Sequence, residues 1–193
     1  MEEKRIKKIN PLYFLSYIFG PVILCGLCFL LSHLYFPKGI GAVVLIMGPS
    51  FLSFIWWVFG GSFFYKHKVK KFERELDGAG FNRNNTFYGR GKTVIIDETD
   101  GSVGLIFFWN PFQTYVFPAS RIQKAWVDDG RGGKGFLEGS SRVSFLFLVD
   151  GIKIRVDTFT SNQRWRMDSD YILTGISKAD VVVQALNEAR RRS

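Results

Sequence analysis

The stretch that decides the fold runs from Pro11 to Tyr65 and reads PLYFLSYIFGPVILCGLCFLLSHLYFPKGIGAVVLIMGPSFLSFIWWVFGGSFFY. Residues 11–37 and 39–65 form two runs of 27 residues without Asp, Glu, Lys or Arg, separated by Lys38. About 20 mostly apolar helical residues cross the ~30 Å hydrocarbon core of a bilayer. The sequence therefore predicts a membrane protein with a transmembrane helical hairpin over 11–65, with spans at about 12–36 and 40–65.

Basic residues stand at both ends of this hairpin. The lead 1–10 and the segment after Tyr65 supply Lys4, Arg5, Lys7, Lys8, Lys66, Lys68, Lys70 and Lys71. Because basic residues flank membrane spans on the cytoplasmic side, we expect both termini in the cytoplasm. The apolar run after the lead is too long for a cleaved signal peptide, and no small-residue cleavage site follows it.

Each predicted span contains one Gly-Pro pair, Gly20-Pro21 and Gly48-Pro49. Proline removes a helical hydrogen bond and bends a helix. We interpret both pairs as ordinary kinks rather than as broken helices along a transport path, since neither span carries an acidic or basic residue.

The chain beyond the hairpin is close to neutral. Residues 72–189 hold 14 Lys or Arg against 15 Asp or Glu, and three arginines follow at 190–192. A nucleic-acid surface would spread basic charge over one face of the domain, so we expect no nucleic acid as a partner.

Hydrophobic periodicity divides this part into one helix, a series of strands and a final helix. Residues 66–76 form a juxtamembrane helix with Val69, Phe72 and Leu76 on one face, and 77–80 end it. Strands are expected at 86–88, 93–97, 103–109, 114–117, 121–127, 143–149 and 152–157. Their turns lie at Asp100-Gly101, at Asn110-Pro111 and at Asp150-Gly151.

Three later segments complete the pattern. The glycine-rich segment 128–141 predicts a loop, and the polar segment 160–171 predicts irregular structure. Ser177 to Asp180 matches a capping box that opens the last helix. That helix directs Val182, Val183, Leu186 and Ala189 toward a core.

Seven short antiparallel strands followed by one amphipathic helix over residues 86–193 resemble the pleckstrin-homology (PH) superfold. The whole chain is similar to bacterial membrane proteins in which a two-helix hairpin precedes a PH-like domain. The resemblance implies a bent sheet closed by the terminal helix, a cytoplasmic PH-like domain, and location in the bacterial inner membrane. It does not by itself imply a function.

Reactive side chains are scarce. Cys25 and Cys28 both lie in the first span, where we interpret the CxxC spacing as two small apolar residues. The part after Tyr65 has no cysteine and only His67, which excludes thiol chemistry, Ser-His pairs and His or Cys metal sites there. Its carboxylates fall in turns and loops. The sequence therefore predicts no enzyme, no metal site, no cofactor and no identifiable small-molecule substrate.

Two groups of residues are candidates for binding. The apolar turn at 107–112 and the loop at 130–135 present Phe108, Trp109, Phe112, Arg131 and Lys134 to a partner protein. Lys66, Lys68, Lys70, Lys71, Arg90 and Lys92, with Arg83 nearby, are candidates for anionic lipid. The loop lacks the Ser or Thr and the helix of a phosphate-binding P-loop.

Three functions remain open at this point. The first is a membrane-anchored interaction module that binds another protein, as an accessory subunit or as an immunity or exclusion factor, or that forms a homo-oligomer. The second is a module that senses anionic lipid headgroups. The third is a membrane enzyme that uses carboxylates, which would need two of them to converge in a buried pocket.

Overall fold

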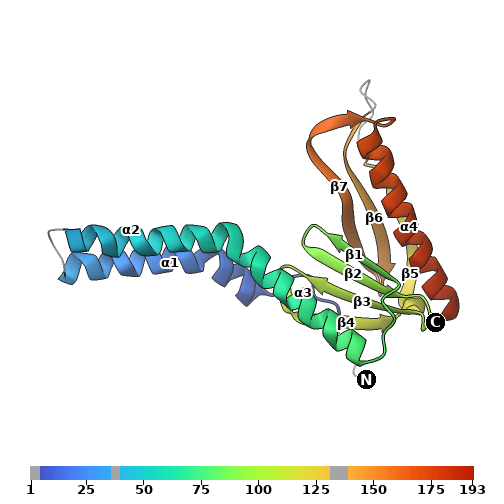
Figure 1. Cartoon of the computed structure of the whole chain (residues 1–193), viewed down its shortest axis with the longest axis horizontal. Coiled ribbons are helices and arrows are strands. Elements are labelled where there is room, and N and C mark those ends of the chain that lie inside the picture. The colour runs from blue at the N-terminus through green and yellow to red at the C-terminus, as the bar shows by residue number, and fades with distance from the viewer. Residues whose placement is uncertain (1–4, 36–39, 131–138) are drawn as a thin grey trace. The chain divides into compact units, whose positions relative to one another are not determined.

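The computed structural model describes residues 5–35, 40–130 and 139–193 (Figure 1). The chain divides into two compact units. The hairpin unit contains Lys7–Lys71 and the short segment Phe108–Phe112. The β unit contains Phe72–Phe107 and Gln113–Ser193, and Ile6 belongs to it as well. The chain therefore passes between the units several times.

Helices form most of the hairpin unit. Helix α1 (Pro11–Tyr35) packs against α2 (Ile40–Ile55), and a π-helical segment, η1 (Trp56–Gly60), leads from α2 into α3 (Gly61–Gly78). The two helical stretches expected on either side of Lys38 are thus present. The second stretch is divided among three successive elements, and the connector at Lys38 lies outside the described residues.

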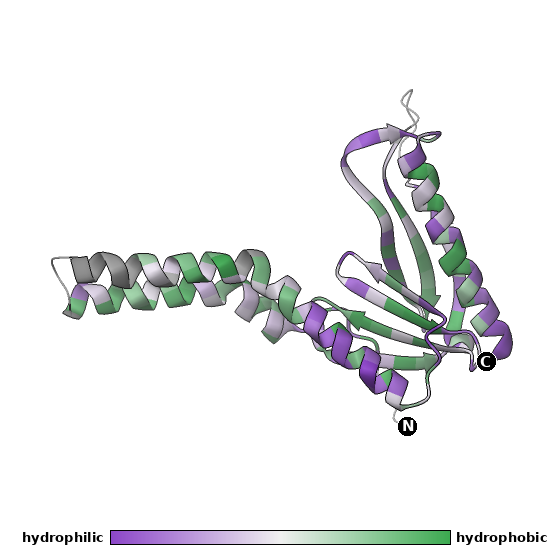
Figure 2. Ribbon diagram, viewed as in Figure 1, coloured by the Kyte–Doolittle hydropathy of each residue, from purple (hydrophilic) through white to green (hydrophobic). Residues whose placement is uncertain are grey.

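Helix α1 has the length and composition of a membrane span. Within the described part of the chain, Pro11–Leu34 is the one segment that meets both criteria. Figure 2 shows α1 almost free of strongly hydrophilic residues, whereas α3 carries many. The large apolar side chains of α1 are exposed, among them Leu12, Val22, Ile23, Phe29 and Leu34.

The start of α1 follows a familiar capping pattern. The Asn10 Oδ1 accepts the backbone N–H groups of Leu12 at 3.1 Å and Tyr13 at 3.2 Å. Asn10 is therefore the N-cap, and Pro11 occupies the first helical position, where its missing N–H leaves no donor unsatisfied.

The end of α3 is a Schellman motif. Gly80 has φ +80°, the Phe81 N–H donates to the Leu76 carbonyl at 3.0 Å, and the Gly80 N–H donates to Asp77 at 3.1 Å. This is the C-cap predicted from the sequence. The predicted apolar face is confirmed too, because Val69, Phe72 and Leu76 are all buried.

The β unit contains two antiparallel sheets and a long helix in its described residues. The order in the first sheet is β1-β2-β3-β4 and in the second β5-β6-β7. The strands are β1 (Asn85–Gly89), β2 (Lys92–Asp97), β3 (Ser102–Phe107), β4 (Asn110–Pro118), β5 (Ile122–Asp128), β6 (Gly139–Val149) and β7 (Ile152–Arg166). A 3-10 turn, η2 (Ala119–Arg121), joins the sheets, and α4 (Asp170–Arg192) ends the chain. The predicted seven strands and terminal helix are confirmed.

One core joins both sheets to α4, which packs on strands of each. Its fully buried members alternate along the strands, as a period of two requires. The main contributors are Val94, Ile96, Val103, Leu105, Phe145, Phe147, Ile154, Val156, Ile172, Leu186 and Ala189. Ile6 adds a side chain from before the hairpin, which the sequence pattern did not indicate.

Two predicted boundaries in the strands are wrong. Strand β3 ends at Phe107 and β4 already begins at Asn110, so the turn lies two residues earlier than the predicted Asn110-Pro111. Pro111 is tolerated because β4 is an edge strand. The predicted irregular segment is also wrong from Thr160 to Arg166, since these residues continue β7 and pair with the start of β6.

The predicted start of the last helix is wrong as well. Helix α4 begins at Asp170, and Ser177 lies inside it. Ile172 and Gly175 are buried on the same side as Ala179 and Val182, at helical spacing. Core packing therefore extends the helix upstream of the capping-box pattern.

The Asp150-Gly151 turn is confirmed. Asp150 has φ +49° and Gly151 has φ +75°, the positive values that a two-residue type I′ hairpin needs at both central positions. Asp150 also forms an ion pair with Arg121 of η2.

Gly175 allows α4 to approach the second sheet closely. A Cβ atom at this position would lie 2.8 Å from the Phe159 Cβ and 3.2 Å from the Val143 Cβ. These atoms are next to the backbone and cannot rotate away. We expect Gly175→Ala to lower the free energy of unfolding of the β unit by about 1–3 kcal/mol, although helix propensity alone favours alanine by about 1 kcal/mol.

Chemical denaturation followed by tryptophan fluorescence measures this difference. Gly78→Ala is the matched control, because a Cβ there meets no atom within 4 Å. Equal stability of Gly175→Ala and the unmodified protein would contradict the packing argument.

Candidate functional site

Eight aromatic side chains gather in the hairpin unit, and we call this group the aromatic collar. It comprises Tyr13, Phe14, Tyr17, Phe64, Tyr65, Phe108, Trp109 and Phe112. They come from the start of α1, the start of α3, the turn between β3 and β4, and the beginning of β4.

Most rings of the collar meet edge to face. The Trp109 ring centroid lies 5.1 Å from that of Phe14 and 5.6 Å from that of Tyr17. The Phe108 ring lies 5.6 Å from Tyr65, and the Phe112 ring 5.6 Å from Tyr13. Each such pair contributes about 0.5–1.5 kcal/mol to stability, in addition to the contribution from burying the ring surfaces. The collar therefore holds the turn firmly against the two helices.

Backbone groups fix the same turn. The Asn10 N–H donates to the Trp109 carbonyl at 2.8 Å. The Asn110 Nδ2 donates to the Lys7 carbonyl at 2.8 Å, and Asn110 is 2 % exposed. The segment that caps α1 is thus hydrogen-bonded directly to the turn. The buried Asn110 amide also replaces the water that the Lys7 carbonyl would otherwise bind.

Lysines border the collar. The Lys68 Nζ lies 5.3 Å from the Phe64 ring centroid and 5.2 Å from that of Phe112, within range of a cation–π interaction. Lys66, Lys70 and Lys71 are exposed. Aromatic rings in contact with one lysine, on a helix that carries three exposed lysines, suit both the apolar and the anionic parts of a lipid headgroup region.

The predicted partner-binding turn is therefore largely occupied by the chain itself. Phe108 and Trp109 are half-buried in the collar, whereas Phe112 is 60 % exposed. Arg131 and Lys134, the other candidates for a partner, lie outside the described residues.

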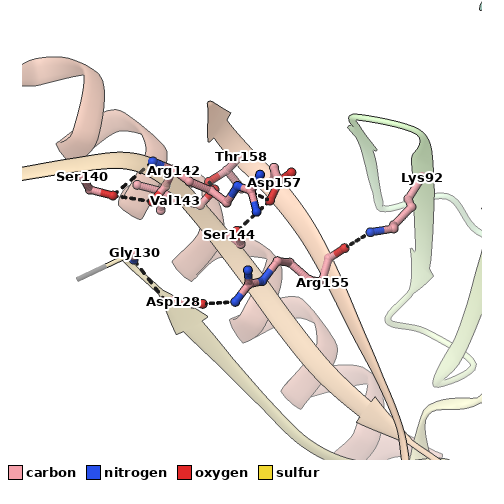
Figure 3. Close-up of polar contacts among 10 residues, drawn as sticks. All are labelled: Lys92, Asp128, Gly130, Ser140, Arg142, Val143, Ser144, Arg155, Asp157 and Thr158. Carbon is pink, nitrogen blue, oxygen red and sulfur yellow. Dashed lines mark hydrogen bonds and ion pairs between the residues drawn. The ribbon is translucent and has the colours of Figure 1, made fainter. Parts of the chain in front are cut away.

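The predicted anion-binding residues Arg90 and Lys92 belong to the β unit. Arg90 is exposed in the turn between β1 and β2, but Lys92 is half-buried at the start of β2. Figure 3 shows the Lys92 Nζ directed at the carbonyl of Arg155 on β7, to which it donates at 2.5 Å. Lys92 thus links the two sheets. Arg83 pairs with Asp77 at 2.6 Å and with Glu73 at 3.6 Å.

A polar cluster continues along the second sheet (Figure 3). The Arg155 Nη2 lies 2.6 Å from the Asp128 Oδ2, and the Arg142 Nε lies 3.6 Å from the Asp157 Oδ1. The Ser144 Oγ donates to Asp157 at 2.8 Å. The basic and acidic side chains of this cluster pair on partly exposed strands, where each ion pair contributes about 0–1 kcal/mol to the free energy of unfolding.

The geometry of this cluster suits cross-strand pairing better than catalysis. Asp157 on β7 pairs with Arg142 on the neighbouring β6, and Asp128 on β5 pairs with Arg155 on β7, across the central strand. Within the described residues, no group of three His, Cys, Asp or Glu side chains has the arrangement of a metal site.

The collar is the feature that sequence reasoning missed. The sequence shows aromatics at the ends of both spans and again at 107–112, but no local pattern says that these three places meet. The hydrogen bonds from Asn10 to Trp109 and from Asn110 to Lys7 were missed for the same reason. Comparison of the chain with protein-family models, with curated proteins and with solved structures finds no match.

Tyr88 and Glu73 join β1 to the end of α3. The Tyr88 Oη donates to the Glu73 Oε1 at 2.6 Å. This bond, with partial desolvation and the charge of Glu73, raises the pKa of Tyr88 from 10.0 to about 12. The pKa of Tyr88 is higher in the folded protein than in the unfolded chain. The contribution of the Tyr88–Glu73 hydrogen bond to stability is therefore complete below pH 10 and is lost as the pH rises toward 12.

The ultraviolet absorbance of phenolate, as the difference between the unmodified protein and Tyr88→Phe, measures this pKa. We expect Glu73→Gln to lower the midpoint toward 10.0, since it removes the acceptor charge. A Tyr88 that titrates at its ordinary value in the unmodified protein would contradict the hydrogen bond.

Proposed function

We propose that the chain is a non-enzymatic, membrane-anchored interaction module. In this proposal α1 and the helical run from α2 into α3 cross the bilayer, both termini are cytoplasmic, and the β unit is a PH-like domain at the membrane surface. The aromatic collar is the observation that carries the proposal, because it gathers amphipathic rings and lysines at one end of an apolar helix pair.

The collar fits the headgroup region of a bilayer. Tyrosine and tryptophan are enriched at this depth because their rings are apolar and their polar atoms reach water. The charged residues begin here as well, with Lys7 and Lys8 before α1 and Lys66 after the second run. The basic charge favours the cytoplasmic side.

The β unit supports the PH-like interpretation through its order of elements. Four strands and then three strands precede a helix that packs on both sheets. The bacterial inner membrane is part of the proposal on the same resemblance.

The proposed partner is another protein of the membrane, for which the chain serves as an accessory subunit or as an immunity or exclusion factor. The long edge strand β7 supports this role, because edge strands can receive an extended segment of a partner. Anchoring would raise the effective concentration of the module near such a partner.

The proposed function predicts membrane insertion. We expect the protein to stay in the membrane fraction after alkaline carbonate extraction, since the exposed apolar face of α1 has no other cover among the described residues. The thiol of the Ser193→Cys variant, in a Cys25→Ala/Cys28→Ala background, should react with an impermeant maleimide only from the cytoplasmic side. Release by carbonate would contradict the anchor, and labelling from outside would contradict the orientation.

A second candidate function, sensing of anionic lipid, is favoured by the exposed lysines beside the collar. We expect Lys66→Gln/Lys70→Gln/Lys71→Gln to reduce enrichment of a fluorescent anionic lipid around the protein, because each lysine near a membrane surface contributes about 1 kcal/mol. Energy transfer from tryptophan to that lipid in mixed vesicles measures the enrichment.

The matched control replaces Lys124, Lys153 and Lys178 of the β unit by glutamine, which removes the same charge elsewhere. If both triple variants and the unmodified protein show equal enrichment, the lipid-sensing function is wrong. Gentle detergent extraction with mass spectrometry then separates the candidates, since a stoichiometric protein partner favours the accessory role and bound anionic lipid alone favours sensing.

A further inference from the structure

The face of the second sheet opposite the core carries a compact group of lysine and apolar side chains. The core residues of β6 alternate with residues of this opposite face, which include Leu146 and Leu148. The strand register places Lys124 of β5 and Lys153 of β7 on either side of Leu148 in one row, and Trp126 of β5 beside Leu146 in the next row. We call Lys124, Trp126, Leu148 and Lys153 the Trp126 patch.

Two ammonium groups from different strands lie near the same indole ring. The Lys124 Nζ is 5.5 Å from the centroid of the Trp126 ring, and the Lys153 Nζ is 5.4 Å from it. Both distances are within the range of a cation–π interaction. Both lysines are exposed, while Trp126 and Leu148 are half-buried. The patch therefore presents positive charge around a partly uncovered apolar centre.

This combination of side chains suits an acidic segment of a protein. Tryptophan is enriched among the side chains that contribute most to binding at protein interfaces, because its ring offers a large apolar area. The Trp126 ring brings both ammonium groups close to one place, so neighbouring carboxylates of one segment can reach Lys124 and Lys153 together. Complementary charges of this kind give an interface its specificity.

The rows beyond the patch distinguish such a segment from an anionic membrane. On the same face Asp128 pairs with Arg155, and Asp157 pairs with Arg142. The side chains of Asp128 and Asp157 are 32 % and 18 % exposed. A membrane surface of uniform negative charge would repel these carboxylates, since like charges at short range are unfavourable. A protein segment can place its own carboxylates at the lysine row alone.

We propose that the β unit binds its partner protein through the Trp126 patch, and that the partner contributes an acidic segment with a central apolar side chain. In the complex, the Lys124 and Lys153 ammonium groups donate to carboxylates of the segment, and its apolar side chain packs on Trp126 and Leu148. This inference rests on the proposed function as a protein-interaction module, and it names the surface and the chemistry of the partner.

The test measures the binding of a synthetic peptide to the full-length protein in nanodiscs of zwitterionic phosphatidylcholine. The peptide carries a fluorescent dye and has two leucines between runs of glutamate, and fluorescence anisotropy reports its affinity. Control peptides have glutamine or lysine in place of glutamate. We expect the glutamate peptide alone to bind, and to bind several-fold more weakly as salt screens the exposed charges. Absence of this binding, or equal binding of the glutamine peptide, overturns the proposal.

Substitutions show whether the peptide binds at the patch. We expect Lys124→Gln/Lys153→Gln to weaken binding of the glutamate peptide about fivefold or more, and Trp126→Ala about tenfold. The matched control Arg90→Gln/Lys178→Gln removes the same charge from exposed positions elsewhere in the β unit and should bind as the unmodified protein does. Equal affinities of the two double variants overturn the patch as the binding site.

Two further variants guard against misfolding. Lys124→Glu/Lys153→Glu should lose the glutamate peptide and bind the lysine peptide, a gain that an unfolded protein would not show. Trp126→Phe keeps an aromatic ring and should bind more tightly than Trp126→Ala. If the charge-reversed variant still prefers the glutamate peptide, the proposal is wrong.

Co-purification separates this inference from the proposed function. Gentle detergent extraction is compared between the unmodified protein, Lys124→Glu/Lys153→Glu and the Arg90→Gln/Lys178→Gln control. Loss of a stoichiometric protein partner by the charge-reversed variant alone supports the patch, whereas equal retention by all three overturns the patch and leaves the proposed function standing. If none retains a partner, the proposed function is wrong and this inference falls with it.

An anionic membrane is the other possible occupant of the patch. The measurement is the enrichment of fluorescent anionic lipid around the protein in mixed vesicles. We expect Lys124→Glu/Lys153→Glu to leave this enrichment close to that of the unmodified protein. If the variant lowers it as much as Lys66→Gln/Lys70→Gln/Lys71→Gln does, the patch binds lipid and the proposal is wrong.

Discussion

The packing of the segment Phe108–Phe112, the β3–β4 turn and the beginning of β4, against the starts of α1 and α3 is the interaction on which the hairpin unit depends. Edge-to-face rings supply its specificity, because the electropositive edge of one ring meets the electronegative face of another. Asn10 adds hydrogen bonds to this packing, since its side chain caps α1 and its N–H donates to the Trp109 carbonyl. A turn from a β-sheet therefore becomes part of a helical unit.

The charged side chains of the polar cluster form ion pairs between strands of the second sheet. Arg142 on β6 pairs with Asp157 on the neighbouring β7, and Arg155 on β7 pairs with Asp128 on β5, across the central strand. Lys68 instead contacts two rings of the aromatic collar, and Lys66, Lys70 and Lys71 are exposed on the same helix. Residues 72–189 are close to neutral, so the formal charge of +9 comes from the segments that flank the hairpin, from Lys38 and from the arginines at 190–192. This distribution suits the proposal that the chain binds at a membrane surface without catalysing a reaction there.

The collar lies at the end of the hairpin unit where the lysines begin, and its rings have polar atoms that suit an interface with water. The edge strand β7 of the β unit is long enough to receive an extended segment of a partner.

The sequence by itself determined the features that follow from local pattern. Two uncharged runs predicted the paired helices, strict alternation predicted the buried Ile154 and Val156, and Asp150-Gly151 predicted its turn. These predictions are confirmed because the periods of helices and strands and the conformation of turns depend on residues close together in the chain.

Tertiary structure alone decided the features that depend on distant residues. Thr160–Arg166 has no apolar alternation and becomes strand by pairing with β6, and α4 starts before Ser177 because Ile172 and Gly175 meet the core. The collar joins rings separated by about a hundred positions, and Lys92 finds its acceptor on β7. No local pattern encodes such contacts, since they arise only when packing brings the elements together.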